Sequence, residues 1–295
     1  MPLISARWNL RLNTQVVGDM TKKIRQCTSG HLNTGTSKCP IDWDKVEGAI
    51  AVKRGVKLPG EITAEELARL CHADGDGRIY PIFPFVEYAK TGGDPQASAN
   101  GYGPVGVTGV DARTDAFTMD KFHEALNASL LRNMNMEMDV YYWDKKKVLH
   151  GYNDGTDVLA GIPMSTIYPT NTPYGTSSAA AAMIVNFCHE DARDSQENFD
   201  YVVLDFNPKN AVVGLTAVEL VSVGEGTYKI VEKVGGYDRT PEFGEEIAAN
   251  AEALLVGATS ATYKDGILTI TSSGSVKLAA PSVLFENGIK GIEQL

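Results

Sequence analysis

A glycine-rich segment at residues 101–106 has the spacing of a nucleotide-binding loop. Its sequence, GYGPVG, matches the GxGxxG pattern, in which glycines let the backbone approach a pyrophosphate at the start of a helix. That chemistry needs a strand directly before the loop and a helix directly after it, and we expect neither here. Pro104 also removes one backbone N–H donor. We therefore interpret the segment as an ordinary loop and predict no cofactor site.

An acidic segment at residues 74–77, DGDG, resembles the middle of a calcium-binding loop, where oxygen ligands alternate around a glycine turn. If Gly77 is the turn glycine, His72 falls at the first ligand position and Phe83 at the last, where carboxylates are required. The segment is better explained as a tight turn.

Cys27, His31 and Cys39 carry the thiolate and imidazole groups that zinc prefers. Their spacing matches no paired zinc knuckle, and a fourth ligand would have to come from Cys71 or His72, so we predict no metal site. The start of the chain lacks the apolar core of an export signal, which favours free thiols over disulfides for all four cysteines: Cys27, Cys39, Cys71 and Cys188.

The remaining chemistry-bearing residues form no catalytic pattern. There is no GxSxG or HExxH motif, and the five histidines show no metal spacing. His189, Glu190 and Asp191 form a polar cluster that we interpret as a solvated turn after a strand. Asn127 begins a formal glycosylation sequon, but on a predicted helix in a chain without an export signal. We predict no catalytic residue and no enzyme; a site assembled from scattered residues is the alternative.

Composition narrows the classes of partner. The 295 residues carry a net charge of −10, which repels the phosphate backbone and disfavours tight binding to nucleic acid. The longest apolar run, Ala179–Val185, is seven residues, whereas a membrane-spanning helix needs roughly 20. We expect a product made in the cytoplasm that binds no membrane.

Short strands and two helices are expected before residue 210. Thr63 and Glu66 form a capping box for a helix at 64–72, and a stripe at i+4 steps predicts another at 120–134. Residues 1–40 are typical of an extended arm, and residues 92–109 of a long loop. The predicted strands lie at 49–58, 79–88, 111–119, 138–143, 147–152, 184–189 and 201–206.

A turn at residues 207–209 divides the chain into two expected domains, 1–210 and 211–295. Beyond it, short strands predict a separate immunoglobulin-like β-sandwich, with Asp265-Gly266 as a type I′ turn. Residues 240–256 are ambiguous, because Thr240 and Pro241 can start a helix that Gly244 weakens. The fold class expected for the whole chain is mainly β with few helices.

The order of elements from residue 111 to residue 206 resembles that of tail tube proteins of tailed bacteriophages. The order is a strand, a helix, a hairpin and two more strands. The short segments GIP at 161–163 and IYPTNTPYG at 167–175 are similar to sequences in structural proteins of gut phages. The resemblance covers about 100 residues and carries no site residue. It implies a barrel-like subunit that forms homo-oligomeric rings, with a C-terminal immunoglobulin-like module outside.

The leading hypothesis is therefore a structural virion protein, a tail tube subunit whose partners are copies of itself and other virion proteins. Its acidity suits a channel through which DNA passes without sticking. Residues 1–39 and 92–109 are predicted to lie at subunit contacts, because ordering such polar segments needs a neighbour. Alternatives are a connector, capsid or decoration protein, or a carbohydrate- or receptor-binding module whose C-terminal domain would use Tyr228, Tyr237 and Tyr263.

Overall fold

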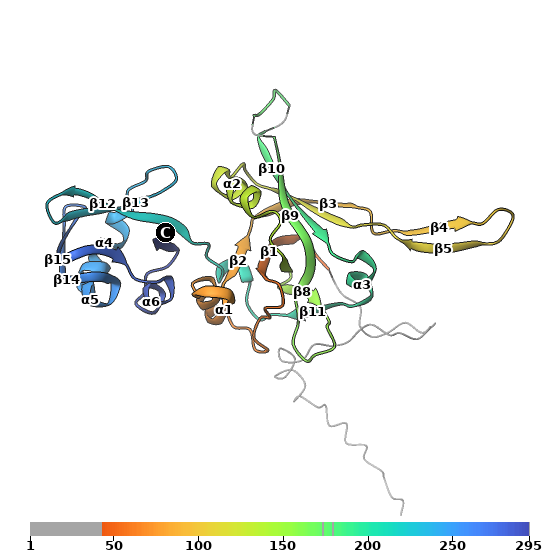
Figure 1. The fold of residues 1–295 in the computed structure, drawn as a ribbon, viewed down its shortest axis with the longest axis horizontal. Helices are drawn as coiled ribbons and strands as arrows, with labels where there is room; N and C mark the ends of the chain where they lie inside the picture. Colours follow the sequence, from red (N-terminus) through yellow and green to blue (C-terminus); the bar gives the residue numbers. More distant parts are fainter. Residues whose placement is uncertain (1–42, 173, 179, 295) are drawn as a thin grey trace, which may run out of the picture.

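The computed structural model describes residues 43–172, 174–178 and 180–294 (Figure 1). Strands hold 45% of the described residues and helical segments 20%, which confirms the mainly β class. No helix within these residues is long and apolar enough to cross a membrane. The predicted arm at 1–40, with Cys27, His31 and Cys39, lies outside the described residues.

Nine strands form one strongly curved sheet. Its main path runs β11-β8-β7-β9-β10-β6-β3, and β1 pairs with both β2 and β7. β1 also lies beside β3 without a hydrogen-bonded ladder, so the sheet is a nearly closed barrel with one unpaired seam. The strands are β1 (Val46–Lys53), β2 (Ile79–Ile82), β3 (Phe85–Thr91), β6 (Thr114–Met119), β7 (Met138–Asp144), β8 (Val148–Tyr152), β9 (Ile162–Thr172), β10 (Ala182–His189) and β11 (Phe199–Val203).

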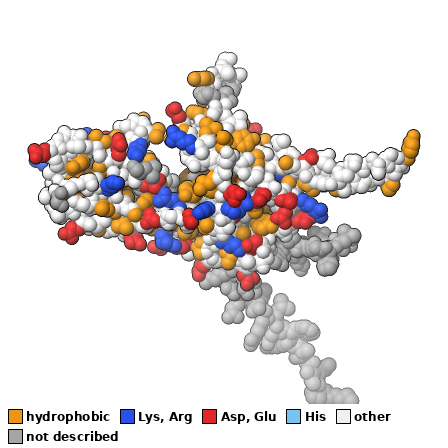
Figure 2. Space-filling view, viewed as in Figure 1, with side chains coloured by type: hydrophobic (Ala, Val, Ile, Leu, Met, Phe, Trp, Pro, Cys, Tyr) orange, Lys and Arg blue, Asp and Glu red, His pale blue; other side chains and the backbone are white. Residues whose placement is uncertain are grey.

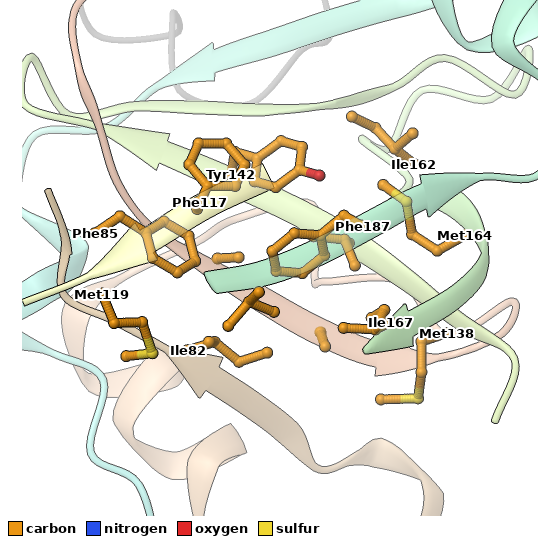
Figure 3. Close-up of a cluster of buried hydrophobic side chains, with 14 of the residues drawn as sticks. Ile82, Phe85, Phe117, Met119, Met138, Tyr142, Ile162, Met164, Ile167 and Phe187 are labelled. Atoms are coloured by element: carbon orange, nitrogen blue, oxygen red, sulfur yellow. The ribbon is translucent and has the colours of Figure 1, made fainter. Parts of the chain in front are cut away.

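Strand β7 is the centre of this sheet and is buried along its whole length. Because side chains alternate along a strand, Val140 and Tyr142 point into the barrel, while Tyr141 and Trp143 join a second apolar cluster outside it. The inner cluster contains four aromatic residues, Phe85, Phe117, Tyr142 and Phe187, and the Phe117 and Tyr142 rings are 5.2 Å apart (Figure 3). The predicted hairpin at 138–152 is confirmed as β7–β8.

Helices cover two sides of the barrel. α1 (Ala64–Cys71) begins at the predicted cap, where the Thr63 hydroxyl accepts from the Glu66 N–H at 3.1 Å, and it buries Leu67 in the outer cluster. α2 (Glu124–Asn133) packs Leu126 and Leu130 against the inner cluster. α3 (Ala192–Glu197), η2 (Gly75–Gly77) and η3 (Pro208–Asn210) are short.

The prediction of a loop at 92–109 is wrong, because this segment contains β4 (Pro95–Ala99) and β5 (Val105–Val110), which form a two-stranded antiparallel hairpin. We call residues 95–110 the arm hairpin. Its glycines and small polar residues hide the alternation of apolar and polar side chains that marks a strand, since neither of its faces is buried.

The C-terminal part is one mixed sheet in the order β14-β15-β13-β12-β16, so the prediction of a two-sheet sandwich is wrong. Helices occupy the place of the second sheet, and Phe243, Ile247 and Leu254 fill its core. The Tyr263 ring packs directly over Gly244 of α4, where a Cβ would lie 2.5 Å from the ring, so this position of the helix has room for glycine alone. The elements are β12 (Thr216–Gly224), β13 (Thr227–Glu232), α4 (Thr240–Ala249), α5 (Ala251–Leu254), β14 (Leu255–Lys264), β15 (Ile267–Leu278), α6 (Pro281–Glu286) and β16 (Ile292–Gln294).

The β14–β15 turn follows the sequence prediction. Asp265 and Gly266 have φ angles of 50° and 77°, and a type I′ turn needs positive φ at both positions.

The two parts touch through a small set of contacts. Arg78 donates to the Glu293 carboxylate at 2.7 Å, the Gly291 N–H donates to His72 Nε2 at 2.9 Å, and the His72 ring stacks on Phe285. No strand pairing joins the two sheets within the described residues. The division at 210/211 stays a prediction for limited proteolysis.

Candidate functional site

The arm hairpin projects from the barrel into solvent (Figure 1). β4 and β5 pair with each other and with no other strand of the described chain. The base is tied down by the Gly93 N–H, which donates to the Asp111 carbonyl at 3.2 Å, and by the Gln196 amide, which donates to the Gly93 carbonyl at 3.0 Å. An isolated two-stranded hairpin is marginal in water, so this one depends on its base and on whatever covers its faces.

The arm hairpin has an apolar end and no charge. Apolar side chains gather at its tip (Figure 2). Tyr102 is fully exposed, and Val105 and Val107 are 69% and 70% exposed. Residues 95–110 contain no Asp, Glu, Lys or Arg, although such residues make up 22% of the chain. An exposed apolar and uncharged surface of this kind is typical of a contact with another molecule.

The barrel offers two further exposed features. β3 pairs with β6 on one side, and its other side is the unpaired seam facing β1, where Val86 is 62% exposed. The β9–β10 connection extends beyond the barrel and carries Tyr174, which is 83% exposed. Unpaired strand edges can pair with a strand from another chain.

Behind the seam lies a cavity of about 740 Å³, which we call the barrel cavity. Its mouth is formed by the residues just before and within the first strand, 43–47, and by residues 85–88 of β3. Trp43 stacks on Phe199 at a ring-centroid distance of 4.6 Å. The apolar part of the lining includes Trp43, Phe85, Phe117, Ile162 and Phe199.

A buried polar cluster lies in the wall of this cavity, centred on the Asp115 carboxylate. Arg113 donates to both carboxylate oxygens at 3.0 Å, the Tyr88 hydroxyl donates to Oδ1 at 2.9 Å, and His189 Nε2 lies 2.7 Å from Oδ2. Burial raises the pKa of Asp115, but His189 and Arg113 outweigh it, and the net pKa is lowered. Burial and the neighbouring carboxylate raise the pKa of Tyr88 to about 12. The cluster therefore joins a carboxylate to a guanidinium and a phenol.

Two buried polar atoms beside this cluster have no hydrogen-bond partner within the described residues: the Tyr142 hydroxyl and His189 Nδ1. Both are shielded from solvent. A buried polar group without a partner costs free energy, about 1–3 kcal/mol. The cluster therefore carries a cost in stability.

A second histidine–aspartate pair anchors the β7–β8 turn. Asp144 is fully buried and accepts from the Val148 and Lys146 N–H groups at 2.9 and 2.8 Å, and His150 Nε2 lies 3.3 Å away. Burial raises the pKa of Asp144, but His150 and the backbone N–H groups of Val148 and Asp44 outweigh it and lower the pKa overall. The pair holds the turn, and Trp43 covers it at 4.8 Å from His150.

The structure places the motif-like glycines and acids of the sequence in unrelated roles. Gly101 and Gly103 form the turn of the arm hairpin, away from any helix start. Asp74 accepts from the Ser282 hydroxyl, and Asp76 pairs with Lys53 at 2.9 Å. In the part of the chain that the structure describes, no group of three or more His, Cys, Asp or Glu side chains is arranged to hold a metal ion.

The prediction of a solvated turn at 189–191 is wrong for His189, which is buried against Asp115. Glu190 is exposed and pairs with Arg54, and Asp191 caps α3 by accepting from the Asp194 N–H at 3.0 Å. Sequence reasoning missed the cluster, because His189 and Asp115 are 74 residues apart and no motif links them.

The described thiols are free. Cys71 is buried, and burial raises the pKa of its thiol to about 11. Cys188 lies 3.4 Å from the Thr114 hydroxyl. Of the three tyrosines proposed for glycan binding, only Tyr237 is exposed, while Tyr228 and Tyr263 pack against the C-terminal core.

A comparison with models of known protein families gives no match, and a comparison with the sequences of curated proteins gives none either.

Proposed function

We propose that the chain is a structural subunit that assembles with copies of itself, and that it serves as a tail tube subunit of a tailed bacteriophage. The observation that carries the proposal is the arm hairpin, which exposes Tyr102 in its turn and Val105 and Val107 on β5 to solvent. Burying a valine side chain contributes about 1.5–3 kcal/mol. The exposed side chains of the arm therefore favour binding to another molecule, and a second copy of the chain is the simplest partner.

The barrel supports the same proposal. The unpaired side of β3 offers backbone groups to a strand of a neighbour, and such pairing joins subunits into a continuous wall. A contact between an arm and a different surface of the next copy is head-to-tail, which closes into a ring when the rotation permits. The net charge of −10 suits a channel for DNA, because it repels phosphate along the passage.

The test is the oligomeric state of the full chain and of a variant with a polar arm. We expect the full chain to form rings or tubes in negative-stain images, and Val105→Ser/Val107→Ser to remain monomeric in light scattering. Val223→Ser/Val256→Ser is the matched control, because these valines are 50% and 61% exposed on the C-terminal part. A full chain that stays monomeric at high concentration would refute the proposal, and so would an arm variant that assembles normally.

A second variant tests the N-terminal segment. Deleting residues 1–39 should leave a folded β-protein by circular dichroism that no longer forms rings or tubes in sizing chromatography. Normal assembly of the truncated chain would remove this segment from the subunit contacts.

A further inference from the structure

We propose that the barrel cavity is the receptor for the arm hairpin of a neighbouring copy, with the Tyr102 ring inserted between its aromatic walls. This inference rests on the proposed self-assembly and names the surface on which the arm docks. The cavity opens at the seam between β1 and β3, and the arm carries its most exposed apolar side chains at its tip.

The chemistry of the two surfaces matches. Tyr102 has an apolar ring and a polar hydroxyl, and the barrel cavity has apolar walls and one polar cluster that could contact them. Phe85, Phe117 and Phe199 supply the apolar walls, and the Arg113–Asp115 pair supplies the polar group. Rings packed edge-to-face or offset attract one another beyond the area that they bury.

The charges also match. The arm carries no charged residue, so it can enter a partly buried site without desolvating an ion. Within the cavity, Arg113 is already neutralised by Asp115 through two hydrogen bonds. The remaining charged groups of the lining are of both signs, so no single sign dominates: Asp44, Lys45, Glu47, Glu87 and Lys145.

The donor of the arm is a second copy, because the hairpin of one chain leads away from its own barrel (Figure 1). Its base is held at Gly93 and Asp111, close in sequence to Arg113 in the cavity wall, and the strands run outward from there. Each subunit then offers one arm and one cavity. Such a contact is heterologous and propagates from copy to copy.

The volume allows the fit. A cavity of about 740 Å³ lies in the range of roughly 300–1,000 Å³ that holds drug-sized ligands, which are larger than one tyrosine side chain. The tip of the hairpin can therefore enter with the ring. A side chain that anchors an interface in this way dominates its energy.

The direct test replaces Tyr102 with the photoreactive p-benzoylphenylalanine in the full-length chain. After irradiation of the assembled protein, mass spectrometry should find intermolecular crosslinks to residues 43–47 and 85–88 at the cavity mouth. Crosslinks between subunits at other surfaces would overturn the docking site and leave self-assembly intact. A chain that stays monomeric and yields no intermolecular crosslink would overturn both proposals.

A pair of tyrosine variants gives the matched measurement. Tyr102→Ala should weaken self-association by at least about tenfold, a typical loss for an anchoring aromatic side chain. Tyr174→Ala is the control, because Tyr174 is also exposed on a projecting connection and should change association by less than about twofold. Equal effects of the two substitutions would contradict a specific receptor for Tyr102.

Mixing two defective variants distinguishes insertion of Tyr102 into the barrel cavity from nonspecific association of apolar surfaces. The Tyr102→Ala variant has an intact barrel cavity and a defective arm. The Phe199→Glu variant has an intact arm and a charge in the wall of its barrel cavity. At a concentration at which the unmodified chain just assembles, neither should assemble alone, whereas an equimolar mixture should give a heterodimer by native mass spectrometry. Circular dichroism must show that Phe199→Glu is folded, and Val86→Glu at the mouth replaces it if it is not. Assembly of a folded cavity variant into normal rings would refute the proposal.

Discussion

Strand β7 and the arm hairpin have the same backbone geometry and opposite surroundings. Every residue of β7 is buried, with one face in the barrel and the other against the outer cluster. In β4 and β5, every residue but Val110 is exposed. Two segments can therefore form strands of the same geometry although only one of them buries the apolar surface that stabilises the fold. β7 is stabilised by contacts within its own chain, whereas the arm leaves its apolar side chains exposed.

The largest expected effect on the free energy of unfolding comes from a substitution in the buried strand β7. Trp143→Ala removes a fully buried ring from β7 and should lower the free energy of unfolding by about 3–5 kcal/mol, the usual cost of such a cavity. Val107→Ser on the arm should change it by less than about 0.5 kcal/mol. Urea denaturation of monomeric protein gives both values. A comparable loss for the two substitutions would mean that the arm contributes to the fold.

Two adjacent tyrosines on opposite faces of β7 differ in the hydrogen bonds of their hydroxyls. The Tyr141 hydroxyl accepts from the Leu58 N–H at 3.2 Å and donates to the Leu159 carbonyl at 3.1 Å, whereas the Tyr142 hydroxyl has no partner within the described residues. Tyr141→Phe should therefore cost about 1–3 kcal/mol, because it leaves buried groups unpaired, while Tyr142→Phe should be neutral or stabilising. Thermal unfolding of the two variants distinguishes them, and an equal loss would show that Tyr142 is hydrogen-bonded.

The smallest expected effect concerns the contact between the two parts. His72 Nδ1–H donates to the Ala68 carbonyl at 2.7 Å, so Nε2 is the acceptor for the Gly291 N–H, and the ring must be neutral. Burial lowers the pKa of His72, and the positive charges of Lys290 and Arg78 lower it further, against the Ala68 carbonyl. The folded pKa lies below the unfolded value of 6.5, so this contribution is present above pH 6.5 and is lost as the pH falls through the folded pKa.

The measurement is the free energy of unfolding at pH 7.5 and pH 5.5. Wild-type protein should lose more stability between these values than His72→Gln, by less than about 1 kcal/mol, because an amide cannot take up the proton. Parallel pH profiles for the two chains would show that His72 does not titrate on unfolding.

The sequence predicts best where burial imposes a pattern. The β7–β8 hairpin has aromatic residues on its strands, and α1 begins at the Thr63 cap that the sequence indicates, so both were predicted close to their observed bounds. β9 was missed because Pro163 and Pro169 argue against a strand. Beyond Met164, β9 pairs with no described strand other than β10, so Pro169 is tolerated there.

The C-terminal part shows a different kind of limit. Its strands and its Asp265–Gly266 turn were predictable from local signals, but the layer that covers the sheet was not. Residues 240–254 form helices although Gly244 weakens the local signal, and the Tyr263 ring that packs over Gly244 belongs to β14, later in the chain. The Asp115 cluster is equally invisible to sequence, because its members lie on or beside three neighbouring strands, β3, β6 and β10, whose pairing no local motif predicts.

The uncharged composition of residues 95–110 has a consequence for the solution conditions under which subunits join. Ionic strength screens attraction between exposed charges over about 8–10 Å at physiological salt, but it does not weaken the burial of apolar surface. Sulfate strengthens such burial, because it is excluded from protein surfaces. Sodium chloride up to about 1 M should therefore leave assembly through the arm intact, and ammonium sulfate should lower the protein concentration at which it begins.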